Sequence, residues 1–185
     1  MSGSINKVCV IGAGVMGAGI AAHVANAGVD VVLLDIVPEG ATNRNTITES
    51  AIKKLLKVDP APLMHKRNVK RITPGNIEDD IALLSQCDWI IEAVIERLDI
   101  KQDLYRTIDA SRKPGSIVSS NTSTIPLANL TNEMRKEFCQ NFLIAHFFNP
   151  PRYMRLLELV GGKETGADAL ASVRKFCDVK LGKGV

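Results

Sequence analysis

Apolar and polar positions are arranged in two ways along the chain, and each arrangement predicts one kind of element. Short apolar runs rich in β-branched residues predict strands. These runs lie at 7–12, 31–35, 71–75, 89–94, 115–121, 142–148 and 156–161. Longer segments with apolar residues at helical spacing predict helices. These segments lie at 16–28, 42–58, 77–87, 98–112 and 166–182, and residues 59–71 are predicted as a loop or broken helix.

The order of these elements predicts the fold class. Strands that alternate with helices form crossover units, which build a mostly parallel sheet with helices on both faces. We therefore expect an α/β protein with a doubly wound sheet. A length of 185 residues suits one domain with a sizeable core, so residues 1–185 are taken as that domain.

The composition is that of a globular protein, with 45% hydrophobic and 23% charged residues. The net charge is +3 and the basic residues are scattered, which argues against a nucleic-acid partner but not against a local basic patch for an acidic ligand. No apolar run reaches the length of a membrane span, so we expect no membrane partner.

The four cysteines are far apart and form no CxxC pair; they are Cys9, Cys87, Cys139 and Cys177. This spacing favours reduced thiols over a disulfide framework or a metal site. The segment before the first strand also lacks the apolar core of a secretory signal. We therefore expect a cytoplasmic protein that holds no metal.

A glycine-rich loop follows the first predicted strand and opens the first predicted helix. In GAGVMG, Gly12 permits the tight turn, Gly14 lets the backbone approach a pyrophosphate, and Gly17 lets the helix pack close to the strand. Val15 and Met16 lie at the helix start, where unpaired N–H groups and the helix dipole favour phosphates. The loop predicts a Rossmann-type fold, and we assign these five residues to cofactor binding.

An acidic residue completes the dinucleotide fingerprint. Asp35 ends the second predicted strand, roughly 20 residues beyond the first glycine, where a carboxylate accepts hydrogen bonds from the adenosine ribose. It would repel the extra phosphate of NADP, and residues 36–38 include no Lys or Arg to attract it. The sequence therefore favours NAD. FAD, or a glycine turn without a ligand, are the alternatives.

Two polar residues interrupt the last two apolar runs. His146 lies near the end of the strand at 142–148, and Glu158 lies in the next strand after a Pro-Pro turn. A carboxylate that accepts the N–H of a histidine favours the imidazolium formed when a base takes a proton. The spacing is compatible with a catalytic pair and equally with a structural one. His23 and His65 are interpreted as packed or surface residues.

Four segments, taken in order, resemble the NAD-binding domain of the L-3-hydroxyacyl-CoA dehydrogenases of fatty-acid β-oxidation. They are GAGVMGAGIA, WIIEAVIERLDIKQDLY, SSNTSTIPL and HFFNPPRYMRLLELV. The resemblance covers essentially the whole chain, and the third and fourth segments are specific beyond a generic dinucleotide-binding fold. It implies that His146 is the general base, that Glu158 is its partner, and that Ser123 contacts the 3-oxygen of the substrate.

The resemblance also implies further cofactor and substrate contacts. Asn149, Glu96 and Lys101 are expected near NAD. Ser50 and Lys57 are expected to contact the CoA moiety from one face of the helix at 42–58, although the match needs a one-residue gap. A solvated basic face is the alternative interpretation of that helix.

The chain stops just after a predicted helix, where a further strand would normally follow, so we expect one domain of a longer protein. The resemblance implies a helical C-terminal domain that supplies the acyl pocket, another substrate contact and much of a homodimer interface. We expect the chain alone to bind NAD and to turn over an acyl-CoA thioester poorly or not at all.

The expected function is NAD-dependent oxidation of (S)-3-hydroxyacyl-CoA to 3-oxoacyl-CoA. Two alternatives stay open: another NAD-dependent dehydrogenase of a β-hydroxy acid, and a non-catalytic NAD-binding relative. Arg152 and Arg155 depart from the more apolar residues expected in this segment, which suggests a different approach of the acyl or CoA group.

Overall fold

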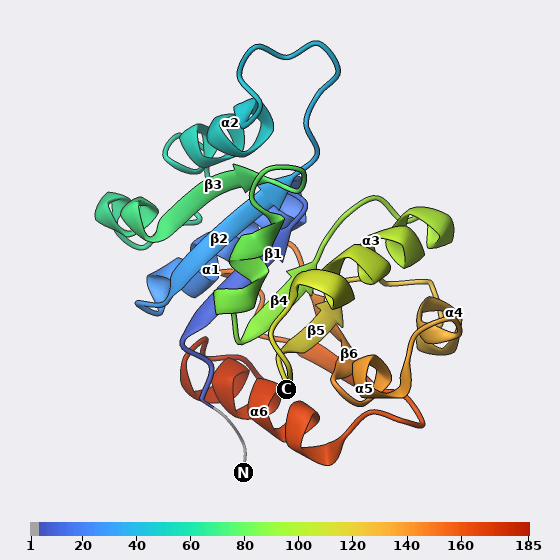
Figure 1. Ribbon diagram of the computed structural model, residues 1–185. Helices are drawn as coiled ribbons and strands as arrows, with labels where there is room; N and C mark the ends of the chain where they lie inside the picture. Colours follow the sequence, from blue (N-terminus) through green and yellow to red (C-terminus); the bar gives the residue numbers. More distant parts are fainter. Residues whose placement is uncertain (1–3) are drawn as a thin grey trace.

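The computed structural model describes residues 4–185, and residues 1–3 of the predicted domain lie outside the described residues. A seven-stranded sheet in the order β3-β2-β1-β4-β5-β6-β7 forms the centre (Figure 1). The strands are β1 Lys7–Ile11, β2 Asp30–Asp35, β3 Ile72–Asn76, β4 Trp89–Glu92, β5 Ile117–Ser120, β6 Phe142–Phe147 and β7 Leu157–Gly161. Strands β1 to β6 pair in parallel, and β7 pairs antiparallel with β6.

Helices cover both faces of the sheet, so the predicted α/β class with a Rossmann-type strand order is confirmed. The α-helices are α1 Val15–Asn26, α2 Thr46–Leu55, α3 Leu98–Ser111, α4 Leu127–Thr131, α5 Lys136–Gln140 and α6 Ala167–Val179. Two 3₁₀ helices are η1 Lys66–Arg71 and η2 Ile81–Gln86. The strand order reverses between β1 and β4, the point at which such sheets bind ligands beyond their carboxyl ends.

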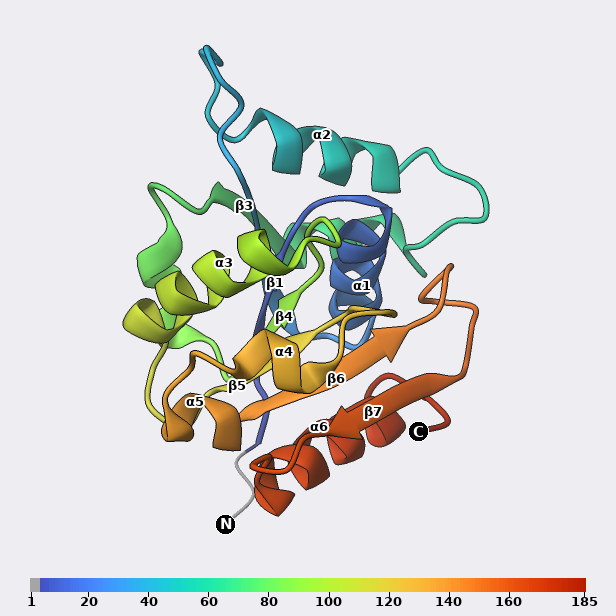
Figure 2. The same cartoon turned by 90° about the vertical axis from the view of Figure 1, so that its right-hand side faces the viewer.

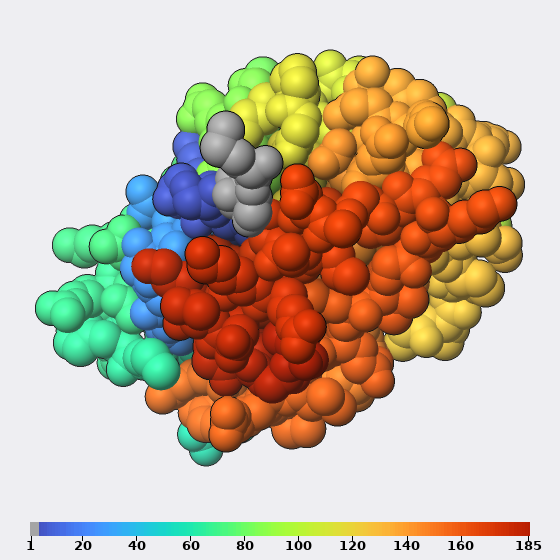
Figure 3. Space-filling model, turned by 90° about the horizontal axis from the view of Figure 1, so that it is seen from below, coloured from blue at the N-terminus to red at the C-terminus, as the bar shows by residue number. Residues whose placement is uncertain are grey.

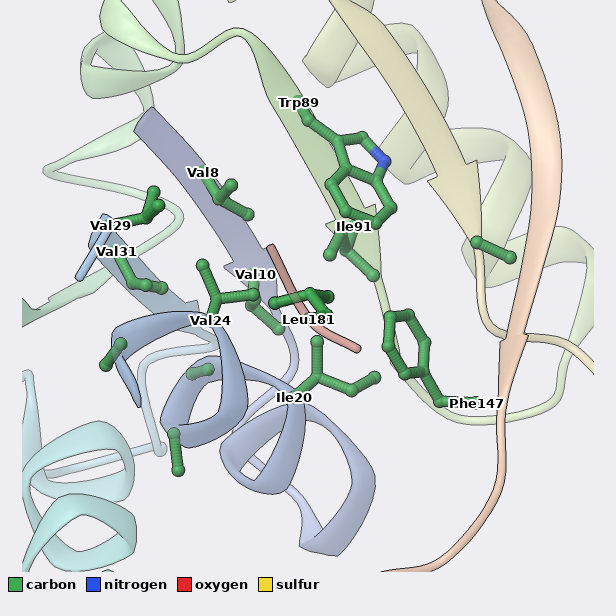
Figure 4. Packing of buried hydrophobic residues seen from close by; sticks show 14 of the residues in the cluster. Val8, Val10, Ile20, Val24, Val29, Val31, Trp89, Ile91, Phe147 and Leu181 are labelled. Atoms are coloured by element: carbon green, nitrogen blue, oxygen red, sulfur yellow. The ribbon is translucent and has the colours of Figure 1, made fainter. Parts of the chain in front are cut away.

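The alternation of side chains along each strand divides the core into two layers. On one face, Val8 and Val10 of β1 pack with Trp89 against Ile20 and Val24 of α1 (Figure 4). Helix α6 packs on the same face, and its residues and the tail after it spread in red across one side of the molecule (Figure 3). Helices α3, α4 and α5 cover the other face. Burial on both faces explains why the strands are nearly continuous apolar runs.

Several predicted helices are shorter than the apolar pattern indicated. The predicted helix at 77–87 contains only the 3₁₀ helix η2. Here the Asn76 side chain accepts hydrogen bonds from the N–H groups of Glu78 and Asp79, which offers the backbone an alternative to helical bonding. Helices α4 and α5, between β5 and β6, were not predicted at all.

The tail after α6 returns to the start of β7. The N–H of Leu157 donates to the carbonyl of Gly184 at 3.0 Å, and the N–H of Gly184 donates to the carbonyl of Arg155 at 2.9 Å. The ammonium of Lys183, whose side chain is buried, donates to the carbonyls of Pro151 and Met154. Figure 2 shows β6 and β7 side by side in opposite directions, with the chain end nearby. The tail therefore holds the connection between these two strands.

Replacing Lys183 tests how much this contact stabilises the fold. Lys183→Met removes the ammonium and its hydrogen bonds to two carbonyls, so the free energy of unfolding should fall by about 1–3 kcal/mol. Urea denaturation of the chain measures the change. Lys180→Met, at an exposed position of the same segment, should stay within about 0.5 kcal/mol of the unmutated protein. Equal losses in both variants would contradict a role for the buried ammonium.

Candidate active site

The glycine loop between β1 and α1 has the geometry that a dinucleotide requires. Gly12 has a φ of +103°, and a Cβ there would lie 2.5 Å from the carbonyl oxygen of Ala93. A Cβ on Gly17 would lie 1.7 Å from the carbonyl oxygen of Gly12. A Cβ on Gly14 would meet no atom within 4 Å, so the loop is open where a pyrophosphate would approach. Helix α1 begins at Val15, next to this open position.

Asp35 lies beside this loop because β1 and β2 are neighbours in the sheet. Its Oδ2 accepts a hydrogen bond from the N–H of Ala13 at 2.5 Å, and its Oδ1 accepts one from the N–H of Ile36 at 2.7 Å. The carboxylate is half-buried at the carboxyl end of β2. It thus lies at the position from which the fingerprint acid reaches a ribose.

His146 and Glu158 face each other directly across β6 and β7 in the antiparallel register. His146 Nδ1 lies 2.9 Å from Glu158 Oε2, and the ring of Phe148 packs at 4.5 Å from the imidazole, centroid to centroid. The histidine side chain is 22% exposed and the glutamate side chain 54%. Because Nδ1 faces the carboxylate, proton transfer with any further group falls to Nε2.

The loop after β5 carries Ser123 to the same edge of the sheet. Ser123 is exposed, whereas Thr122 before it is buried. Asn121 joins this loop to β6: its side-chain oxygen accepts a hydrogen bond from the N–H of Phe147 at 2.9 Å. Since Phe147 directly follows His146, the loop that presents the serine is tied to the strand that presents the histidine.

Glu96 lies in the loop after β4 and contacts the two residues that flank Ser123. Its carboxylate accepts hydrogen bonds from the hydroxyls of Thr122 and Thr124, the latter at 2.9 Å. Desolvation raises the pKa of this carboxyl, but these hydrogen bonds and Lys101 outweigh it and bring the pKa down to about 2. Glu96 is therefore a carboxylate throughout the physiological range.

Lys101 is buried inside the domain and does not lie at the surface where a cofactor would bind. Its side chain is 1% exposed, and its ammonium lies 2.6 Å from Glu92 Oε1 and 3.3 Å from Glu96 Oε2. The ammonium thus lies inside the domain, between two carboxylates, and Glu96 is the more exposed of the two. Sequence reasoning missed Glu92, although an acid in a strand predicted to be buried signals a buried charge that needs a partner.

Asn149 is exposed in the turn after β6, and this turn lies against α1. A Cβ on Gly19 of α1 would lie 3.0 Å from the ring of Pro151. Arg152 donates to the carbonyl of Ala61 at 2.6 Å and lies over the Tyr153 ring at 5.0 Å. The arginine that departs from the expected pattern thus fastens the turn to a neighbouring loop.

The sequence matches the family described as 3-hydroxyacyl-CoA dehydrogenase, NAD binding domain, over residues 7–185. The chain belongs to this family. It is 47% identical to a protein of Bacillus subtilis named "Probable 3-hydroxyacyl-CoA dehydrogenase" and 43% identical to a protein of that name from Deinococcus radiodurans. These matches cover 98% of the chain, but only 25% and 52% of the two relatives.

Solved structures of the same family have the same fold. The crystal structure of FadB2 from M. tuberculosis superposes with a TM-score of 0.82 at 32% identity, covering 99% of this chain and 63% of that one. 3-Hydroxybutyryl-CoA dehydrogenase from Escherichia coli gives 0.81 at 29% identity, covering 97% and 37%. The family and its cofactor, NAD, are those that the sequence predicted.

The CoA contacts expected from the family resemblance rest on a helix that is shorter than predicted. Helix α2 ends at Leu55, and Lys57 lies in the turn beyond it, where the N–H groups of Lys57 and Val58 both donate to the carbonyl of Lys54. The prediction of one helix over 42–58 was wrong at both ends. Ser50 and Lys57 are exposed, and Lys57 lines a hollow of about 330 Å³ with Lys53 and Lys54.

The two remaining histidines belong to other elements, His23 to α1 and His65 to the start of η1. His23 on α1 is buried, and its pKa falls to about 4 because of desolvation and the nearby Lys183. His65 accepts a hydrogen bond from the N–H of Arg67 at the start of η1. All four cysteines carry free thiols, as their spacing predicted.

Among residues 4–185, no group of three or more His, Cys, Asp and Glu side chains could hold a metal ion. None of the described helices is both long and apolar enough to cross a membrane.

The low pKa of Glu96 predicts a pH-dependent contribution to stability. The folded value, about 2, lies below the ordinary 4.5, so the contribution is present above about pH 4.5 and is lost as the pH falls towards 2. The side chain is 38% exposed, so screening reduces the effect, and Glu96→Gln should cost about 1 kcal/mol at neutral pH. Urea denaturation should show a smaller difference near pH 3. If the two proteins differ as much in the free energy of unfolding near pH 3 as at neutral pH, the low pKa of Glu96 is not the cause.

Proposed function

We propose that this chain is the NAD-binding domain of a longer enzyme that oxidises (S)-3-hydroxyacyl-CoA to 3-oxoacyl-CoA in fatty-acid β-oxidation. The observation that carries the proposal is the 2.9 Å contact between His146 and Glu158 at the carboxyl end of β6. A histidine whose Nδ1 faces a carboxylate is arranged as a general base at Nε2. This base lies on the sheet edge that also carries the glycine loop.

In this proposal, each group of site residues has its own role in the reaction. The glycine loop and the start of α1 hold the pyrophosphate, and Asp35 accepts the ribose hydroxyls. His146 Nε2 takes the proton of the 3-hydroxyl, while Glu158 stabilises the resulting imidazolium. Ser123 donates a hydrogen bond to the 3-oxygen. NAD, held by the glycine loop and Asp35, would supply the acceptor for the hydride that leaves C3 of the substrate.

Further residues are assigned to the cofactor. Glu96 and Asn149 contribute near NAD, and Lys101, whose ammonium lies 3.3 Å from Glu96, supports Glu96. The exposed lysines at the end of α2, with Ser50, attract the phosphates of CoA. A helical C-terminal domain supplies the acyl pocket and a homodimer interface, and the enzyme is cytoplasmic.

A second candidate is an NAD-dependent dehydrogenase of another β-hydroxy acid. A protein of Streptomyces coelicolor named L-carnitine dehydrogenase is 30% identical over 98% of this chain, and its name specifies carnitine in place of an acyl-CoA. The two candidates share the base and the cofactor site and differ in what lies beyond the 3-hydroxyl. A preference for CoA thioesters over free hydroxy acids in turnover excludes the second.

Asp35 tests the cofactor assignment. Asp35→Ala removes an acceptor for the ribose hydroxyls, so NADH binding should weaken by roughly 1–3 kcal/mol and discrimination against NADPH should fall. Fluorescence titration of the chain with each cofactor measures both effects. Asp30→Ala, at the opposite end of the same strand where Asp30 pairs with Arg71, is the matched control. Equal affinity of the unmutated chain for NADH and NADPH would refute the assignment.

His146 tests the chemistry, in the longer protein that includes the C-terminal domain. There, His146→Gln should lower turnover of acetoacetyl-CoA with NADH by about 10²–10⁴-fold, the usual contribution of general acid–base catalysis, with NADH affinity nearly unchanged. Loss of NADH absorbance follows the reaction, and His65→Gln at an exposed histidine is the control. If His146→Gln unfolds the protein but leaves the rate per folded molecule intact, the pair is structural.

A further inference from the structure

Glu92, the last residue of β4, is a fully buried carboxylate with four donors. Its Oε1 accepts from the ammonium of Lys101 at 2.6 Å and the N–H of Val94 at 2.8 Å. Its Oε2 accepts from the hydroxyls of Tyr105 at 2.6 Å and Ser120 at 2.7 Å. Removing a charge from water is costly unless it is paired and hydrogen-bonded, and here both conditions are met. The proposed reaction assigns this residue no part.

One path leads from Glu92 to the active-site edge through Lys101. The same ammonium that pairs with Glu92 lies 3.3 Å from Glu96. Glu96 in turn accepts hydrogen bonds from Thr122 and Thr124. These two threonines are the neighbours of Ser123 in the chain, so the buried pair supports the loop on both sides of the serine.

A second path leads through Ser120 to the same loop. The Ser120 hydroxyl donates to Glu92 and accepts from the N–H of Thr122 at 3.2 Å. The N–H of Asn121 donates to the backbone carbonyl of Glu92 at 2.8 Å. The side chain of Asn121 then accepts from the N–H of Phe147 on β6. The network thus reaches both the loop of the serine and the strand of the histidine.

We propose that Glu92 is a positioning residue, whose buried carboxylate fixes Glu96 and the loop 121–124 so that Ser123 is held at a set distance from His146. The effect on catalysis rests on the proposed function, whereas the support of the loop by Glu92 does not. Glu92 touches neither cofactor nor substrate and acts only through Lys101 and Ser120.

Two adjacent serines of β5 provide a matched test. Ser120→Ala removes the second of the two paths from Glu92 to the loop and leaves the path through Lys101 and Glu96 intact. Ser119→Ala removes a buried hydrogen bond of the same kind, from Trp89 Nε1 at 2.9 Å, but on the opposite face of the sheet. In the 185-residue chain, Ser120→Ala should speed amide hydrogen exchange at Thr124 by about tenfold or more, and Ser119→Ala should not. The N–H of Thr124 faces Glu96 and Thr122 and makes no bond to Ser120, so the change reports on the loop as a whole. Equal exchange in the two variants overturns the proposal.

Turnover in the longer protein separates a positioning role from a purely structural one, because a purely structural role would not change kcat per folded molecule. Ser120→Ala should lower kcat by roughly tenfold with little change in NADH affinity, because displacements near 1 Å are enough to cost rate. In a Ser123→Ala background it should have no further effect on kcat, since the group it positions is gone. If Ser120→Ala lowers kcat by the same factor in the Ser123→Ala background as in the unmutated protein, the proposal is overturned. If the unmutated protein has no dehydrogenase activity, the proposed function fails, and the exchange experiment still decides the role of Glu92.

The charged pair itself is tested by comparing a single variant with a double variant. Glu92→Gln leaves Lys101 buried without its main partner, whereas Glu92→Gln with Lys101→Met removes both charges. The double variant should unfold at a higher urea concentration than Glu92→Gln alone. Both variants should exchange the amides of Thr122 and Thr124 faster than the unmutated chain does. Exchange as slow as in the unmutated chain would show that the ion pair does not support the loop.

Discussion

Parallel pairing of six strands is the constraint on which the rest of the structure depends. In a parallel sheet, every loop that leaves a strand at its carboxyl end starts from the same edge. The glycine loop follows β1, Asp35 ends β2, Glu96 follows β4 and Ser123 follows β5. Residues that are more than a hundred positions apart in the sequence therefore lie together at this edge, and no single segment contains them all.

Gathering polar groups at the end of a buried sheet has a cost, and the structure offsets it by pairing. Glu92 and Lys101 lie at 0% and 1% exposure and neutralise each other at 2.6 Å. Glu96, nearer the surface, is bonded to two threonines. The side-chain oxygen of Asn121 accepts a hydrogen bond from the N–H of Phe147, the last residue of β6. These bonds satisfy buried donors and acceptors, and they also leave the loops few alternative positions.

The sequence predicted the seven strands, the cofactor loop and the residues at the edge, because strand patterning and the glycine fingerprint are local signals. It did not predict where α2 ends or that residues 77–80 form no helix, because Asn76 and its neighbours bond their own backbone there. Nor could it give the depth of Lys101, since the family resemblance placed this residue near the cofactor without saying on which side of Glu96. Depth depends on which face of α3 packs on the sheet, which is a tertiary property.

The contact between His146 and Glu158 depends on the direction and register of one strand. Because β7 runs antiparallel to β6, its first residues lie at the edge where β6 ends, and Glu158 lies directly opposite His146. The neighbouring pair, Phe147 and Leu157, points to the other face and is buried in the core. A slip of one residue would bury the carboxylate and expose Leu157, at a cost of several kcal/mol from the charge alone. The apolar residues on either side of Glu158 therefore enforce the register of the pair, so packing on one face of β7 fixes the contact between His146 and Glu158 on the other.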